Sequence, residues 1–186
     1  MRTRLIAIGA VAALLALTGC TGNRAVGAAA LPSEPPVAVK PAAQAGGACI
    51  LWDYKFIQEK IGVAFTVAAA GESDDTSTCV VQTATGDYPD LALSVVESTT
   101  ADGALFLSTL MPKKATKVTG LGKAGYRLVS PAAGAAGPSV EVGWLSEASQ
   151  LQSLKYTFAP GATDDAVATM STKLLALASA MDTTNG

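Results

Sequence analysis

The sequence predicts an α+β domain, in which a mostly antiparallel sheet of about six to seven strands is covered by three helices. Apolar residues recur at helical spacing in three segments, at the start, middle and end of the domain. Between them, short runs alternate apolar and polar side chains, as half-buried strands do. The predicted order is helix, three strands, helix, four strands, helix. We expect all three helices to cover one face of the sheet.

The first helix is expected over residues 50–61, where Ile50, Tyr54, Ile57 and Ile61 recur at helical spacing and Gly62 supplies a stop. Alternating apolar residues then predict three strands. These are expected at residues 63–69, 78–84 and 91–95, with an acidic loop at 71–77 and a turn at 86–90.

The second helix is expected over residues 99–111, where Thr99 and Asp102 resemble a capping box and Pro112 ends the pattern. Four strands should follow at 116–119, 126–129, 139–144 and 154–158, the last two as a hairpin. The last helix has the most regular pattern, and Thr163 or Asp164 is expected to cap it. Its apolar stripe consists of Val167, Met170, Leu174, Leu177 and Met181.

The segment before this domain has the pattern of a secretory signal peptide. Two arginines lie within the first four residues, and residues 5–17 form an uncharged apolar run. The run is too short to span a bilayer, which takes about 20 helical residues. Leu17-Thr18-Gly19-Cys20 resembles the lipobox of bacterial lipoproteins. The resemblance implies a signal peptide over residues 1–19 and a diacylglycerol-modified Cys20, which anchors the protein to the extracytoplasmic face of the cell membrane. The alternative is an ordinary cysteine near a signal-peptidase site.

The stretch after Cys20 predicts a disordered tether, because it is rich in Ala, Gly and Pro and lacks aromatic residues. We therefore divide the mature chain into a lipidated cysteine with its tether over 20–47, a single domain over 48–182 and a tail over 183–186.

Cys49 and Cys79 remain as an even pair once Cys20 is lipidated. An oxidising compartment favours a disulfide between them, and closing a loop of about 30 residues would stabilise the fold by roughly 3–4 kcal/mol. The alternatives are two buried thiols or a shared metal ion. Without histidine, two cysteines so far apart make a poor zinc site.

The composition argues against most catalytic chemistry. The chain has no histidine, which excludes a Ser-His-Asp or Cys-His enzyme. Residues 120–125 match G-x-G-x-x-G, but the following residues read as a strand, so we predict a glycine-rich turn rather than a dinucleotide site. Asp74-Asp75 and Asp164-Asp165 lack the spacing of a calcium site. No Ser-x-x-Lys motif occurs. We expect no enzymatic activity, no cofactor and no metal.

The charge pattern also limits the partners. The net charge is −2, and removal of the signal peptide takes away two arginines. Only Lys113 and Lys114 stand together, so there is no basic patch for nucleic acid or an acidic lipid surface.

The order of these features is similar to that of the small envelope lipoproteins of actinobacteria, mycobacteria included, that carry a two-cysteine domain of unknown function. The features are Cys20, Cys49, Gly62, Cys79 and the segment from Gly120 to Tyr126. The resemblance implies a place in the cell envelope and no activity.

The sequence therefore favours a non-enzymatic binding or accessory module, anchored to the membrane, whose partner is an envelope protein or a cell-wall component. Such a module should expose an apolar patch of several hundred Å² on the uncovered sheet face. The alternative is a carrier of a lipid or other apolar ligand, which needs an enclosed cavity of roughly 300–1,000 Å³.

Overall fold

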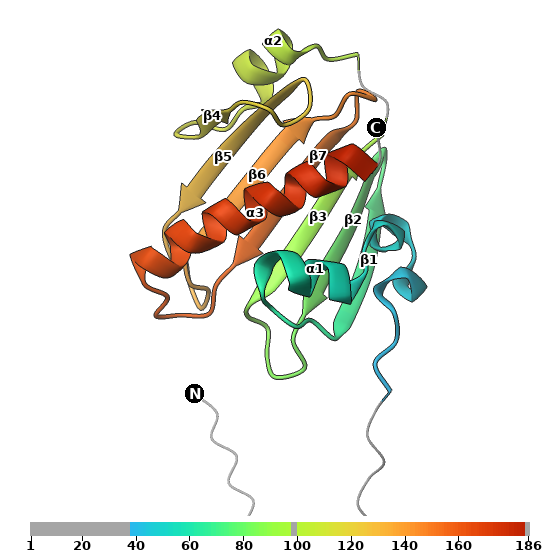
Figure 1. Cartoon of the computed structure of the whole chain (residues 1–186), viewed down its shortest axis with the longest axis vertical. Helices are drawn as coiled ribbons and strands as arrows, with labels where there is room; N and C mark the ends of the chain where they lie inside the picture. Colours follow the sequence, from blue (N-terminus) through green and yellow to red (C-terminus); the bar gives the residue numbers. More distant parts are fainter. Residues whose placement is uncertain (1–37, 98–99, 185–186) are drawn as a thin grey trace, which may run out of the picture. The chain divides into compact units, whose positions relative to one another are not determined.

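The computed structural model describes residues 38–97 and 100–184, with side chains up to residue 181. Seven strands form one antiparallel sheet in these ranges, in the order β1-β2-β3-β7-β6-β5-β4 (Figure 1). The strands are β1 (Val67–Ser73), β2 (Thr76–Gln82), β3 (Asp90–Val96), β4 (Thr116–Val118), β5 (Ala124–Ser130), β6 (Ser139–Leu145) and β7 (Leu151–Thr157). The helical elements are η1 (Ala42–Ala45), η2 (Gly47–Leu51), α1 (Tyr54–Ile61), α2 (Gly103–Leu105), η3 (Phe106–Leu110) and α3 (Asp164–Thr184).

The strand order confirms the predicted α+β class and its mostly antiparallel sheet. The first three strands form a meander, and the chain then crosses to the far edge at β4. From there β5, β6 and β7 return strand by strand to the centre, where β7 pairs with β3. The two halves of the domain therefore meet at one central antiparallel pair.

Helices α1 and α3 pack on one face of the sheet, which we call the helix face (Figure 1). The predicted stripe of α3 is buried in this layer. Facing it are the alternate residues of the central strands, which the register aligns in rows across the sheet. They are Cys79, Val81, Leu91, Leu93, Val95, Val140, Val142, Trp144, Leu154 and Tyr156. No helix within the described ranges is both long enough and apolar enough to cross a membrane.

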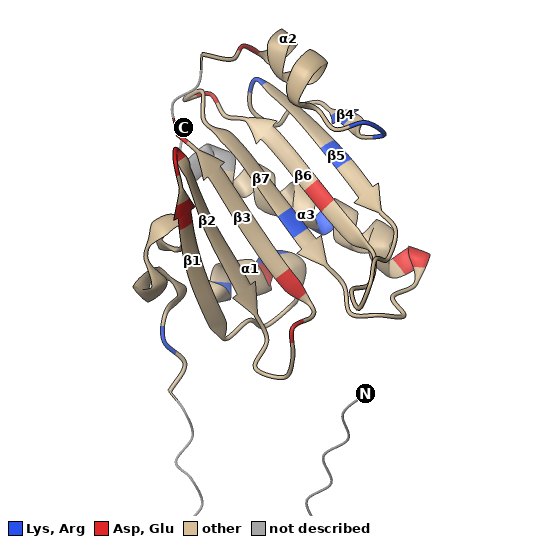
Figure 2. Ribbon diagram, turned by 180° about the vertical axis from the view of Figure 1, so that it is seen from behind, with Lys and Arg blue, Asp and Glu red and all other residues tan. Residues whose placement is uncertain are grey.

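The middle helix does not lie with the other two, which corrects our expectation of a single covered face. Phe106 of η3 stacks on Tyr126 of β5, with ring centroids 5.8 Å apart. Its cluster includes Ala124 and Leu145, whose register places them on the side opposite Trp144. The short α2–η3 segment therefore covers one end of the second face, which is otherwise free of helices (Figure 2).

The first helix is shorter than predicted. It begins at Tyr54, because the Asp53 side chain accepts a hydrogen bond of 2.7 Å from the Lys55 amide and caps the first turn. It ends at Gly62, as predicted, where φ is 81°. Residues 47–51 form the separate 3-10 turn η2 instead of a first helical turn.

The acidic loop predicted over 71–77 is also wrong. β1 runs to Ser73 and β2 starts at Thr76, so Asp74 and Asp75 form a two-residue hairpin turn. The strand expected from residue 63 begins only at Val67. β1 is a solvent-exposed edge strand, and it therefore lacks the burial alternation that the prediction used.

The packed part of the chain begins before residue 48. Residues 42–45, which we assigned to the tether, form η1, and Ala42 is buried. η1 is a single short turn whose one buried side chain is an alanine. Its sequence therefore shows no helical repeat of large apolar residues that could have predicted it. The predicted signal peptide, Cys20 and most of the predicted tether lie outside the described residues.

Candidate functional site

The predicted disulfide joins Cys49 to Cys79 and fixes η2 against the sheet. Both cysteines are fully buried, and their Cα atoms lie 4.9 Å apart, within the usual range for a disulfide. Cys49 lies in η2 and Cys79 in the middle of β2. The bond therefore holds a turn that has little core of its own at a defined position over β1 and β2.

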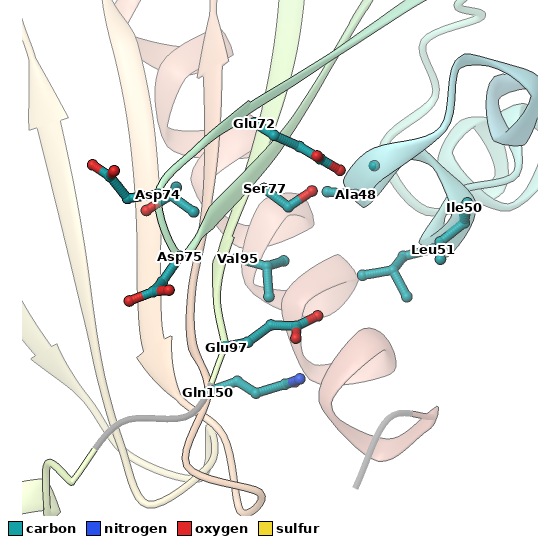
Figure 3. Close-up of a pocket in the computed structure, with 12 residues that line it drawn as sticks. Ala48, Ile50, Leu51, Glu72, Asp74, Asp75, Ser77, Val95, Glu97 and Gln150 are labelled. Carbon is teal, nitrogen blue, oxygen red and sulfur yellow. The ribbon is translucent and has the colours of Figure 1, made fainter.

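A surface groove of about 800 Å³ lies beside this turn, and we call it the edge groove (Figure 3). One wall is η2, and the other is the end of the β1–β2 hairpin. The end of β3 and the residue before β7 complete the lining. The lining residues are Gly47, Ala48, Ile50, Leu51, Glu72, Asp74, Asp75, Thr76, Ser77, Val95, Glu97 and Gln150.

The lining of the edge groove carries negative charge only. Four of its residues are Asp or Glu, and none is Lys or Arg. Figure 3 shows Glu72, Glu97 and Gln150 extending toward the η2 wall, whereas Asp74 and Asp75 extend away from it. Two carboxylates thus face the space beside η2, and two more add to the negative potential at the outer rim.

Two aliphatic side chains of η2 border the same groove. Ile50 is 67% exposed and Leu51 is 38% exposed, so both present apolar surface to the solvent. The helical spacing of Ile50 with Tyr54 and Ile57 placed it on the apolar side of the predicted first helix. The break of the helix at Asp53 turns it outward instead.

Close packing between η2 and the hairpin depends on Gly47. Its φ is 50°, and a Cβ at this position would lie 3.1 Å from Ser77 Oγ and 3.2 Å from Ala70 Cβ. Glycine therefore provides both the left-handed conformation and the space that the turn needs. The shape of the groove depends on this contact together with the disulfide.

The second face carries charged residues on its central strands, namely Asp90 of β3, Lys155 of β7 and Glu141 of β6. Figure 2 colours the charged positions of these strands on the ribbon. Tyr126 Oη donates a 2.6 Å hydrogen bond to Glu141 Oε1, and Lys155 lies directly opposite Glu141 in the register. Burial raises the pKa of Asp90, although the Thr157 side chain and the Lys155 charge act in the opposite direction. Burial and Glu141 raise the pKa of Tyr126, which keeps its hydroxyl protonated as a donor. Lys155 thus lies opposite Glu141 and also acts on the charge of Asp90.

The second face does not carry the apolar patch that we expected of a docking surface. Among the large hydrophobic residues exposed in the described ranges, Val67 alone lies on a strand with its side chain on this face. Small and hydroxyl side chains occupy most of the face, and they include Ala92, Ser94 and Ser153. The edge groove, rather than the sheet face, combines exposed apolar surface with charge.

The glycine motif forms a strand-to-strand turn, as predicted. Residues 119–123 connect β4 to β5, and a strand rather than a helix follows them. Gly122 has a φ of 51°, and a Cβ there would collide with the Leu145 carbonyl oxygen. The segment has no helix N-terminus to hold a pyrophosphate.

The carboxylate pairs lie apart from each other. Asp74 and Asp75 form the β1–β2 turn, and Asp164 and Asp165 begin α3. In the part of the chain that the structure describes, no three Cys, Asp or Glu side chains are grouped to hold a metal ion.

No protein-family model matches the chain, and no curated protein or solved structure does. The interpretation of the edge groove therefore depends on its own geometry and charge.

Proposed function

We propose that this chain is a lipid-anchored protein of the cell envelope whose domain is a non-enzymatic binding module. Its edge groove receives a positively charged, partly apolar segment of a partner protein. The observation that carries the proposal is the pairing of an all-acidic groove with the exposed side chains of Ile50 and Leu51.

A basic segment with aliphatic side chains complements both properties. Lys or Arg residues would meet Glu72 and Glu97, and an aliphatic neighbour would cover Ile50. Each exposed ion pair contributes up to about 1 kcal/mol, and full burial of an Ile side chain contributes about 2 kcal/mol. Such terms give modest, reversible binding. They also disfavour a cell-wall polymer rich in carboxylates, which the groove would repel.

The lipid anchor is a separate part of the proposal and rests on the lipobox. The modification brings at least two acyl chains, which suffice for stable membrane attachment. A Cys20→Ser variant should lose the acyl mass in mass spectrometry and should move from the membrane to the soluble fraction. Retention of the variant in the membrane fraction would refute lipid anchoring at this residue.

The groove is tested by fluorescence anisotropy with two synthetic peptides on the mature protein. One peptide alternates Lys and Leu, and the other alternates Glu and Leu. We expect only the lysine peptide to bind, with an affinity that falls as salt increases. The double variant Glu72→Gln/Glu97→Gln should weaken binding at least tenfold.

The matched control removes two exposed carboxylates elsewhere, by Glu59→Gln/Asp87→Asn. It has the same net charge as the groove variant and should bind within twofold of the wild type. Equal weakening by both variants would show a nonspecific effect of net charge. That result, or equal binding of the glutamate peptide, would refute the groove as a specific site.

A carrier of an apolar ligand is the second candidate. The pockets found in the described residues are open grooves rather than enclosed cavities. This geometry favours the binding module.

A further inference from the structure

A second groove, separate from the edge groove, lies on the helix face between α3 and β5. It has a volume of about 460 Å³, and we call it the helix groove. Figure 1 shows α3 crossing the sheet with β5 beside its N-terminal half, at the opposite edge of the sheet from η2 and β1. The lining residues are Arg127, Val129, Asp164, Val167, Ala168, Ser171 and Thr172.

Ser171 brings an unsatisfied hydroxyl to this groove. The residue is 2% exposed, and its Oγ has no hydrogen-bond partner in the part of the chain that the structure describes. A serine in a helix can donate to the carbonyl oxygen four residues earlier, but this one does not. A buried polar group without a partner costs about 1–3 kcal/mol, so native proteins keep few of them. A ligand that accepts a hydrogen bond from Ser171 would remove this cost.

Arg127 brings a guanidinium group that has no partner among the described residues. It is the single arginine of the described ranges, and it makes neither an ion pair nor a side-chain hydrogen bond to other residues in those ranges. A guanidinium offers a planar set of donors that fits a carboxylate or a phosphate. Arg127 is half-buried. Its register position opposite Val142 places it on the helix face, where it lines the groove together with residues of α3.

The polarity of the helix groove changes along its length. β5 runs in the same direction as β7, and α3 follows β7 and returns across the sheet. β5 and α3 are therefore antiparallel, which places Arg127 toward Ser171 and Thr172, and Val129 toward Val167. Asp164 lies at the far end, about 10 Å from Ser171 along the helix axis. An anionic group thus fits one end and an apolar group the middle.

We propose that the helix groove binds an amphiphilic anion. Its carboxylate or phosphate group contacts Arg127 and accepts a hydrogen bond from Ser171, and its apolar part lies against Val129 and Val167. The lined length from residue 164 to residue 172 is about 12 Å, which accommodates a short acyl or aryl group. The anionic group is either the carboxylate of an acid with an apolar chain or a phosphate ester that carries such a chain.

The test titrates the mature protein with three probes, which are decanoate, decanol and inorganic phosphate. Binding is followed by NMR through the backbone amides of α3 and β5. We expect decanoate to bind at least tenfold more tightly than decanol. If inorganic phosphate binds as tightly as decanoate with the same dependence on Arg127, the groove recognises the anion alone and the amphiphilic proposal is overturned. If decanoate binds and phosphate does not, the apolar part is required, as proposed. Equal binding of decanoate and decanol would overturn the proposal.

Variants separate the site from general effects on the fold. Arg127→Gln should weaken decanoate binding at least tenfold, and Lys117→Gln, which removes an exposed lysine from β4, should leave it unchanged. Ser171→Ala should weaken decanoate binding and also raise the melting temperature of the unliganded protein, because it removes the unsatisfied hydroxyl. A purely structural role of Ser171 would not weaken binding. No effect of Arg127→Gln would overturn the proposal.

The helix groove and the edge groove share no lining residue, so the two proposals can fail independently. Glu72→Gln/Glu97→Gln should leave decanoate binding unchanged, and Arg127→Gln should leave peptide binding unchanged.

Discussion

Removal of the Cys49–Cys79 disulfide should lower the stability of the domain and also weaken the binding of the lysine peptide to the edge groove. The perturbation is the double variant Cys49→Ala/Cys79→Ala. The bond closes a loop with a sequence separation of 30 residues. The entropy of closing such a loop in the unfolded chain corresponds to about 3–4 kcal/mol at 25 °C. Both cysteines are fully buried, so replacing sulfur by hydrogen also removes some packing.

Thermal unfolding followed by circular dichroism measures the loss. For a domain of this size, 1 kcal/mol changes the melting temperature by about 2–4 °C, so we expect a decrease of about 10 °C. A second variant, Cys49→Val/Cys79→Val, lacks the bond but retains apolar volume in the core. The two variants should lose similar stability if the cross-link is responsible, whereas a packing effect would spare the valine variant.

The same variants test the link between the disulfide and the groove. Without the bond, η2 is held by few buried residues, so amide hydrogen exchange over residues 47–51 should accelerate. Binding of the lysine peptide should weaken in parallel. A stability loss below about 1 kcal/mol in both variants, together with unchanged exchange in η2, would refute this reasoning.

Three further predictions concern stability. Lys173 Nζ donates a 3.0 Å hydrogen bond to the Ile61 carbonyl oxygen and connects α3 to the end of α1, so Lys173→Met should cost about 1–2 kcal/mol in urea unfolding; an unchanged midpoint would contradict this. Gly122→Ala places a Cβ against the Leu145 carbonyl oxygen at a positive φ and should cost more than about 2 kcal/mol in the same assay, whereas a loss within error would show that the turn can rearrange. Burial raises the pKa of Asp90 above its unfolded value, so the folded state is most stable with this group protonated and loses stability as the pH rises through the folded pKa. Asp90→Asn should therefore stabilise the domain near neutral pH and lose this advantage below the unfolded pKa, and a pH-independent difference would contradict the sign.

The elements that the sequence predicted correctly depend on local signals. The stripe from Val167 to Met181 specifies α3, because every residue of the stripe is separated from the next by three or four positions and all are buried in the structure. The disulfide followed from the parity of the cysteines and an oxidising compartment. Neither inference needed to know which strands are neighbours.

The wrong predictions fall where two local signals competed. The helical spacing of Ile50 and Tyr54 suggested one continuous helix, but the Asp53 carboxylate caps a new helix between them. Asp is a favoured N-cap residue, so Asp53 itself could have indicated that the helix starts at Tyr54. At the hairpin, the polar residues 71–77 suggested a loop, but an exposed edge strand can be polar on both faces.

The middle helix shows the limit of local patterns. Its apolar residues indicated a helix that packs on the sheet, yet they carry no information on which face it covers. The face follows from the crossover between β3 and β4, which leads the chain to the far edge of the sheet. Phe106 then meets Tyr126 on the side away from α3.

The edge groove could not be predicted from the sequence either, because local patterns do not tell which distant segments become neighbours. Glu72 and Glu97 are 25 residues apart, and they border one space because β1, β2 and β3 form a meander whose ends meet there. The acidic hairpin alone predicted a solvated loop. The proposed binding also needs the apolar side chains of Ile50 and Leu51, which the Cys49–Cys79 bond places beside this charge. A cross-link that stabilises the fold thus also fixes the apolar side of an acidic groove. Loss of peptide binding in a variant that keeps the disulfide and its melting temperature, such as Glu72→Gln/Glu97→Gln, would separate these two roles.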